Sequence, residues 1–105
     1  MTGKTGVTLR GEQVVFLSQE DEAAFFHWLE KLNDFATALG AGDTILIEVK
    51  SSKLDDTQLR ELIALFHRYR IDMSQLVAFE TRSNKTWLRN KQAFWYDAMY
   101  EPAHV

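Results

Sequence analysis

Glu48 and Lys50 are the residues whose types and spacing come nearest to a catalytic pair, and they follow the apolar run Ile45-Leu46-Ile47. Residues two apart on a strand point to the same side, so both side chains would share one face. A carboxylate there could bind Mg²⁺, and the lysine could steady a phosphate or the water that attacks it. The pair therefore suggests metal-dependent cleavage of phosphate esters.

This spacing resembles the E-x-K half of the PD-(D/E)xK nucleases, in which a second metal-binding carboxylate comes from the preceding strand of a hairpin. Here the segment before Glu48 is predicted to be a long helix, and Asp43 lies too close, at the start of the same strand. A magnesium ion held by one or two carboxylates needs that second anchor. The nuclease is thus one of three functional hypotheses, and it lacks half of its site.

Other catalytic and cofactor-binding patterns are missing from the sequence. It contains no cysteine, and its three histidines do not have the spacing of a zinc site. It has no G-x-S-x-G nucleophile elbow, no G-x-G-x-x-G and no Walker loop. We therefore predict a protein without enzymatic activity, without a cofactor and without a metal site.

The length and net charge bound the class of protein. The 105 residues suit a single domain, residues 1–105, with one modest core. A net charge of −3 gives no general attraction to nucleic acid or to an anionic membrane, so neither is expected as a partner. No apolar run reaches the length of a signal-peptide core or of a membrane span. These features predict a cytoplasmic protein whose partner is another protein.

Charge is distributed unevenly along the chain. Residues 82–91 carry four bases and no acid, whereas residues 18–40 carry five acids and one base. Either segment could be a partner surface, or both could be solvated helix faces. An acidic surface of this kind would suit an immunity or inhibitor protein that neutralises a toxin. The acids concerned are Glu20, Asp21, Glu22, Glu30 and Asp34.

The first half of the chain is predicted to contain two short strands, one long helix and a buried strand. The β-rich runs 7–9 and 14–17 indicate the short strands, as a hairpin or as two edge strands. Apolar residues at three-to-four spacing predict a helix over residues 19–39, ended by the glycines that follow it. The uninterrupted apolar run 45–47 predicts a central strand covered on both faces.

The second half is predicted to add two helices and a strand. One helix begins at about Asp56, with Asp55 as its N-cap and Gln58 completing a capping box. The run 76–79 reads as a buried strand, and residues 85–100 as the last helix. Strands alternating with helices predict right-handed crossovers. The expected fold is α/β, in the order β-β-α-β-α-β-α, with a mostly parallel central sheet and an antiparallel edge strand.

Three segments resemble the STAS group, including its SpoIIAA-like branch, whose members are small α/β domains best known from anti-sigma-factor antagonists. The segments are VTLRGEQVVFLSQEDEAAFFHWLEKL, ILIEVKSSKLDDTQL and LVAFETRSNKTWL. The second resembles the strand and helix start that bear the family's D-S-S/T-G-L motif, which here reads Asp55-Asp56-Thr57-Gln58-Leu59. The resemblance covers most of the chain and is mainly topological.

The resemblance implies a regulatory domain that binds another protein without catalysis. Asp56 stands where the family's phosphoacceptor serine would be, so a phosphorylation switch is not expected. A carboxylate at a helix N-terminus also stabilises the helix itself, and the same residues read as an ordinary helix start. The expected contact surface joins this helix start to that of the last helix. It consists of Lys53, Asp55, Asp56, Thr57, Arg82, Lys85 and Arg89.

Other binding features stay open. Serines, lysines and arginines at the predicted strand ends could hold an anion, or could cap the helices that follow. The end of the chain is rich in aromatic residues, most of which are expected in the core, with Tyr96 and Tyr100 as an exposed patch. The sequence also leaves self-association as a homodimer open.

Overall fold

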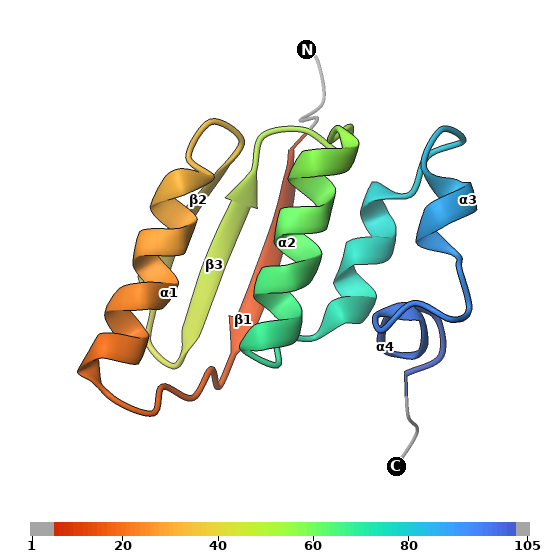
Figure 1. Ribbon diagram of the computed structural model, residues 1–105. Helices are drawn as coiled ribbons and strands as arrows, with labels where there is room; N and C mark the ends of the chain where they lie inside the picture. Colours follow the sequence, from red (N-terminus) through yellow and green to blue (C-terminus); the bar gives the residue numbers. More distant parts are fainter. Residues whose placement is uncertain (1–5, 103–105) are drawn as a thin grey trace. The chain divides into compact units, whose positions relative to one another are not determined.

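The computed structural model describes residues 6–102, and the chain divides into two compact units. Unit 1 comprises residues 1–52 and unit 2 comprises residues 53–105. Unit 1 combines a sheet with one helix, whereas every regular element described in unit 2 is helical (Figure 1).

Unit 1 is built on a three-stranded antiparallel sheet. In chain order its elements are β1 (Val7–Glu12), α1 (Gln19–Lys31), β2 (Ala36–Ala41) and β3 (Thr44–Val49). The strand order is β1-β3-β2, so β3 lies in the centre and pairs antiparallel with both neighbours (Figure 1). β1 and β2 are therefore the two edges of the sheet.

One face of this sheet is buried and the other is exposed. Along β3, Ile47 and Val49 are buried whereas Glu48 between them is exposed, as the two-residue period of a strand requires. Ile47 pairs with Leu9 of β1, which is also buried, and α1 contacts β2 and buries Phe25. The predicted central strand is confirmed at β3, but the prediction that both of its faces are covered is wrong.

A tight hairpin joins β2 to β3. Ala41 pairs with Thr44, which leaves Gly42 and Asp43 as a two-residue loop. Gly42 has a φ of 62°, a left-handed conformation that glycine adopts without steric cost. Two-residue hairpin loops favour the primed turns, in which the first loop residue has a positive φ. Gly42 thus helps to fix the register in which β2 meets β3.

Unit 2 is built from four helical segments. They are α2 (Asp56–Arg68), the 3₁₀ helix η1 (Met73–Phe79), α3 (Lys85–Leu88) and α4 (Tyr96–Tyr100). The short η1 contacts both α2 and α4 and so connects the long helix to the end of the chain (Figure 1). The fully buried side chains of unit 2 include Leu59, Leu62, Ile63, Leu65, Phe66, Leu76, Phe79 and Leu88.

Both ends of α2 are fixed by local hydrogen bonds. The Asp55 carboxylate accepts from the N–H of Gln58 at 2.7 Å, and the Gln58 side chain accepts from the N–H of Asp55 at 3.0 Å. This reciprocal capping box confirms the predicted helix start. At the other end Arg70 has a φ of 57°, and the N–H of Ile71 donates to the carbonyl of Phe66 at 2.9 Å. That is a Schellman ending, in which glycine usually occupies the position of Arg70.

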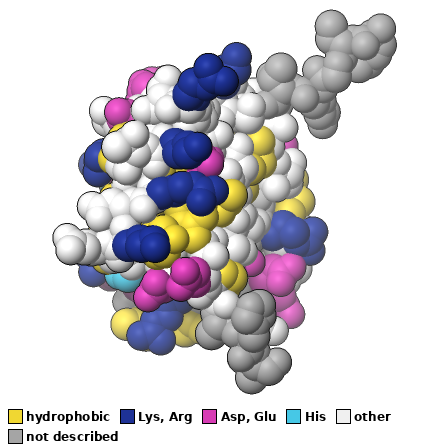
Figure 2. Space-filling view, turned by 90° about the vertical axis from the view of Figure 1, so that its right-hand side faces the viewer, with side chains coloured by type: hydrophobic (Ala, Val, Ile, Leu, Met, Phe, Trp, Pro, Cys, Tyr) yellow, Lys and Arg dark blue, Asp and Glu magenta, His cyan; other side chains and the backbone are white. Residues whose placement is uncertain are grey.

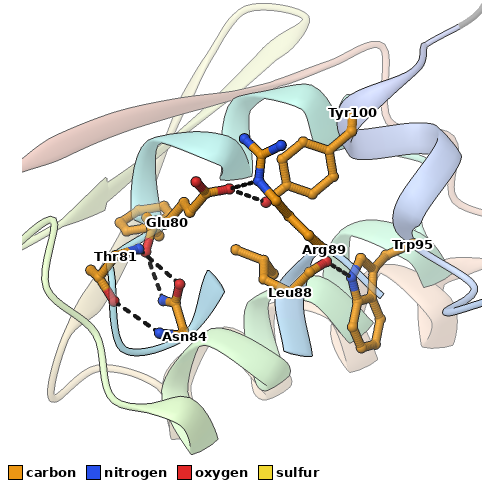
Figure 3. Close-up of polar contacts among 8 residues, drawn as sticks. Glu80, Thr81, Asn84, Leu88, Arg89, Trp95 and Tyr100 are labelled. Carbon is orange, nitrogen blue, oxygen red and sulfur yellow. Dashed lines mark hydrogen bonds and ion pairs between the residues drawn. The ribbon is translucent and has the colours of Figure 1, made fainter. Parts of the chain in front are cut away.

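Side chains that bond to the backbone join the short segments of unit 2 (Figure 3). The Asn84 amide nitrogen donates to the carbonyl of Phe79 at 2.9 Å, and its oxygen accepts from the N–H of Thr81 at 2.8 Å. The Trp95 indole N–H donates to the carbonyl of Leu88 at 2.8 Å. Helices this short leave many of their backbone groups without helical partners, and these side chains bond to some of them.

The predicted mostly parallel sheet is wrong. The sheet of unit 1 has only antiparallel pairs, and residues 53–102 of unit 2 contain no strand. The observed order is β-α-β-β followed by helices, in place of the expected β-β-α-β-α-β-α of a STAS-like sheet. The correction has a physical reason, since a two-residue loop can join only antiparallel strands, whereas a parallel pair needs a long crossover.

Two predicted elements of unit 1 differ in the structure. The run 14–17 is not a strand, and its Val15 and Leu17 are 71% and 89% exposed. The predicted helix 19–39 ends at Lys31, and its last residues form β2 instead. Over so short a segment the apolar spacing fits a helix and a strand alike, and pairing with β3 decides for the strand.

Two predicted elements of unit 2 also differ. The run 76–79 belongs to η1, because the Asp72 carboxylate accepts from the N–H of Ser74 at 3.0 Å and begins a helical turn there. The predicted helix 85–100 is divided into α3 and α4 by a stretch of turns. Asn84 precedes α3 without capping it, because its side chain is directed to other backbone groups.

Candidate binding site

Most residues of the predicted contact surface are exposed at the starts of α2 and α3, both in unit 2. Lys53, Asp56 and Thr57 are exposed at the first helix start, and Arg82 and Lys85 at the second. Several Lys and Arg side chains line the face on which α3 lies (Figure 2). This surface stays a prediction.

Asp55 and Arg89 of that surface form hydrogen bonds within unit 2. Asp55 forms the capping box, and the Nε of Arg89 donates to Oε1 of Glu80 at 2.8 Å, while the Tyr100 hydroxyl donates to the same oxygen at 2.6 Å (Figure 3). The bonds from Arg89 and then Tyr100 hold the pKa of Glu80 below its ordinary value. Burial, with the bond to Glu80, raises the pKa of Tyr100 well above its ordinary value. Tyr96 is buried, so the expected exposed patch of two tyrosines is wrong.

Aromatic rings and cations pack together elsewhere in unit 2. The Arg60 guanidinium lies 4.0 Å from the centre of the Trp87 ring, which meets Trp95 edge to face at 5.8 Å. The centre of the Phe94 ring lies 5.1 Å from that of Trp95 and 4.6 Å from that of His67. These contacts explain the aromatic residues near the end of the chain as packing within unit 2.

Glu48 and Lys50 lie at the end of β3, where the Thr8 hydroxyl donates to Glu48 at 3.1 Å. The preceding segment is β2, a strand in a hairpin with β3, so the helix expected to separate the two parts of a nuclease site is absent. β2 nevertheless carries no carboxylate, and Asp43 lies in the turn at the other end of β3. Within residues 6–102 no three His, Asp or Glu side chains form a group that could hold a metal ion.

Unit 1 has an open hollow of about 490 Å³. It is bounded by the loop after β1, by the first turns of α1 and by the hairpin end of β2 and β3. Its apolar lining consists of Val14, Val15, Phe16, Phe26 and Ile45. All of these elements belong to the same unit.

The hollow lies over Ile45 and Gly40, where the paired neighbours of Ile45 are both glycines. Ile45 of β3 pairs with Gly11 of β1 and with Gly40 of β2, and directly paired residues point to the same face. Neither neighbour therefore has a side chain that could cover Ile45. A Cβ added at Gly40 would meet no atom within 4 Å, so free space lies directly above this residue.

Acidic side chains border the same hollow. Glu22 and Asp43 line it, and Glu22 belongs to the acidic first turn of α1 with Glu20 and Asp21. Asp21 has a structural role, because its carboxylate accepts from a backbone N–H in the loop before the helix at 2.8 Å. Residues 1–52 as a whole contain eight acids and four bases, so the hollow lies in the acidic part of the chain.

The hollow could not be predicted from the sequence, because it depends on which residues face each other across the sheet. Gly42-Asp43 between two apolar runs is the signal that could have indicated the hairpin. Without the hairpin, Gly40 reads as the end of a helix rather than as an uncovered position on a sheet. Only Glu22 was predicted, as part of the acidic surface.

The sequence matches no protein-family model, no curated protein and no solved structure. The resemblance to STAS domains thus stays a prediction. Across the described residues 6–102, no helix has both the length and the apolar character that crossing a bilayer requires.

Proposed function

We propose that this chain is a protein-binding domain that acts without catalysis, and that the hollow of unit 1 is its contact with the partner. The observation that carries this proposal is an open apolar hollow with acids on its border. It would take a large apolar side chain from a segment of the partner that also bears lysine or arginine. Burying one such side chain contributes about 1.5–3 kcal/mol.

Exposed apolar side chains extend the hollow on one side. Val15 lines it and is 71% exposed, Phe26 lines it from α1 and is also exposed, and Leu17 follows in the same loop. Exposed apolar side chains that gather in one place mark interaction surfaces on soluble proteins. A small-molecule site usually encloses most of its ligand, whereas an open hollow of this kind suits an anchoring side chain of a protein.

The acids give the surface a charge preference. Glu22 and Asp43 would lie near lysines or arginines that flank the inserted side chain. Complementary charge at the rim of an interface speeds association and excludes partners of the same sign, more than it adds affinity. We therefore expect association that slows as the salt concentration rises.

Two classes of binding protein suggested by the sequence fit this contact. One is a regulatory domain, and the other is an immunity or inhibitor protein that neutralises a toxin through the acidic residues of its first helix. The second is favoured by a specific observation, because Glu22 of that acidic surface lines the hollow. A basic partner surface would be the common feature of both.

Selection from a displayed library of random nonapeptides on the purified chain would test the proposal. Enriched peptides should combine one large apolar residue with lysine or arginine. Their affinity, measured by calorimetry, should fall at least tenfold for Gly40→Val, which fills the hollow. Thr37→Val is the matched control, because it lies on the same strand and its side chain points to the opposite face of the sheet.

The charge preference can be tested on the same peptides. Glu22→Gln and Asp43→Asn should each weaken binding several-fold and reduce its salt dependence, whereas Glu30→Gln, further along α1, should change neither. Peptides that lose affinity with Arg82→Glu and not with Gly40→Val would place the contact at the start of α3. A selection that enriches no peptide would contradict the proposal.

A further inference from the structure

β2 is an edge strand without the usual protection against pairing. Its sequence, ATALGA, contains no charged residue and no proline, and within residues 6–102 it pairs only with β3. The opposite edge, β1, carries Arg10 and Glu12, whose side chains form an ion pair at 3.0 Å. Edge strands commonly carry such charges because they discourage pairing with a foreign strand. β2 is therefore the edge that is suited to an added strand.

The hydrogen bonds of the hairpin show which groups of β2 point outward. The N–H of Lys50 donates to the carbonyl of Phe35 at 2.9 Å, and bonded and non-bonded pairs alternate along an antiparallel ladder. Counting from this pair, Ala38 and Gly40 direct their N–H and C=O groups away from β3. The N–H of Ala36 fits the same alternation, because it bonds at 2.8 Å to the turn before β2.

We infer that the partner binds as an extended strand that pairs with β2 and places an apolar side chain opposite Gly40. This assignment deepens the proposed function and rests on it, because that side chain would enter the hollow. Directly paired residues share a face, so the side chain would lie over Gly40 and point toward Ile45. Main-chain bonds to Ala38 and Gly40 would hold the strand, while the hollow would select its side chain.

The charge of unit 1 decides between two possible occupants of the edge. A second copy of this chain would bring a second unit 1 with eight acids and four bases, and like charges oppose that approach. A strand that carries lysine or arginine has the complementary charge. The occupant is therefore a strand of a basic partner protein.

A fixed peptide can test the pairing directly. The probe is the nonapeptide Lys-Val-Lys-Thr-Leu-Thr-Lys-Val-Lys with blocked ends, which presents its central leucine and the nearest lysines on one face. Its sequence is palindromic, so it presents the same side chains whether it pairs parallel or antiparallel. Binding to the full chain is followed by chemical shifts and by amide hydrogen exchange.

The expected result is a set of shifts around the hollow together with slower exchange of the outward amides. The amide protons of Ala38 and Gly40 should exchange at least tenfold more slowly with the peptide bound. Replacing the central leucine by serine, or all lysines by glutamates, should weaken binding at least tenfold. Light scattering of the chain without peptide, measured over a dilution series, should give the molar mass of a monomer. A dimer would compete with the peptide for the same edge.

Two changes remove main-chain bonds, one in the peptide and one in the protein. In the peptide, alternate residues direct their N–H groups to the same edge of the strand. One variant is N-methylated at the leucine and lysines and the other at the threonines and valines, so each variant blocks one edge. One of these two peptides should lose at least tenfold in affinity and the other should stay within about threefold of the parent. In the protein, Ala38→Pro removes an outward N–H that β3 does not use, and Ala38→Ser is its control.

The outcomes separate this inference from the proposed function. One outcome would overturn the strand pairing and leave the hollow as the contact. In that outcome the peptide shifts resonances at the hollow, but exchange at Ala38 and Gly40 is not slowed and both N-methylated peptides bind with equal affinity. A fixed peptide that fails to bind while library peptides occupy the hollow would do the same. Failure of both the fixed peptide and the library would overturn the hollow as well. If Ala38→Pro does not fold, the N-methylated peptides decide alone.

Discussion

The sheet of unit 1 is stabilised by main-chain ladders that run from β1 through β3 to β2, whereas the short helices of unit 2 depend on side chains that bond to the backbone. A ladder tolerates many side chains because its bonds join backbone groups. A turn stabilised by the amide group of one side chain, such as Asn84, does not tolerate replacement of that side chain. Substitutions should therefore act differently in the two units.

The two units also differ in charge and in their exposed apolar side chains. Residues 53–105 contain eight bases and seven acids, so unit 2 is nearly balanced, while unit 1 has twice as many acids as bases. In unit 2 the rings of Trp87 and Trp95 pack edge to face, and the Arg60 guanidinium lies over the Trp87 ring. In unit 1 the apolar side chains of Val15 and Leu17 remain exposed next to a hollow. Phe94 of unit 2 is also exposed, at 57%, but its ring packs against those of Trp95 and His67, whereas Val15 lines the open hollow. This difference is in line with the proposal that unit 1 contacts the partner.

The largest effect is expected at Asn84, the buried polar side chain of unit 2. Asn84→Ala removes a donor to the Phe79 carbonyl and an acceptor for the Thr81 N–H, both in a poorly hydrated place. We expect a loss of about 2–3 kcal/mol in the free energy of unfolding, measured with urea. Asn90→Ala, an exposed asparagine that bonds to the N–H of Gln92, should cost less than about 0.5 kcal/mol. Equal costs would show that unit 2 does not depend on its buried amide.

The next effect is expected in the hairpin of unit 1. Gly42→Ala places a Cβ on a residue with a φ of 62°, and should cost about 1–2 kcal/mol. Gly40→Ala has open space above it and lies in a strand, where glycine is entropically unfavourable, so it should stabilise by about 0.5–1 kcal/mol. Thermal unfolding measures both changes. Changes of the same sign at the two glycines would contradict the assigned hairpin.

A smaller gain is expected at the end of α2. Arg70 is a non-glycine residue with a φ of 57° at the position where a Schellman ending favours glycine. Arg70→Gly should stabilise the chain by roughly 0.5–1 kcal/mol, because it relieves the left-handed strain. Arg68→Gly, inside the helix, is the control and should destabilise by a similar amount. A loss of stability for Arg70→Gly would mean that the arginine side chain contributes more than its backbone costs.

The smallest effect is expected from the ion pair of Glu80, because Glu80 is 19% exposed and Arg89 is 49% exposed. The folded-state pKa of Glu80 lies below its ordinary value of 4.5, so its stabilisation is fully present above that value. It is lost as the pH falls through the lower folded pKa. The stability difference between the wild type and Glu80→Gln should therefore shrink below about pH 4.5. In Arg89→Gln this pH dependence should be weaker, since the largest cause of the shift is removed, and an unchanged profile would contradict that cause.

Local sequence signals predicted only part of this fold. The start of α2 at Asp55 was found because its capping side chain and the residue that it bonds, Gln58, are three apart in the chain. β3 was found because its apolar run is flanked by turn residues. The segment that forms β2 was assigned to a helix, since its alternation is short and its partner strand supplies the deciding contacts.

The sequence by itself determined the capped start of α2, the central strand and the acidic character of residues 18–40, because each depends on neighbouring residues alone. Tertiary structure decided that the sheet is antiparallel and that Gly40 and Gly11 both face Ile45. It also decided that the backbone N–H and C=O of Ala38 point away from β3. These features depend on strand register, and a shift of one residue would turn every side chain of a strand to the opposite face. The hollow and the free edge beside it are therefore products of pairing between segments, which local residue patterns do not specify.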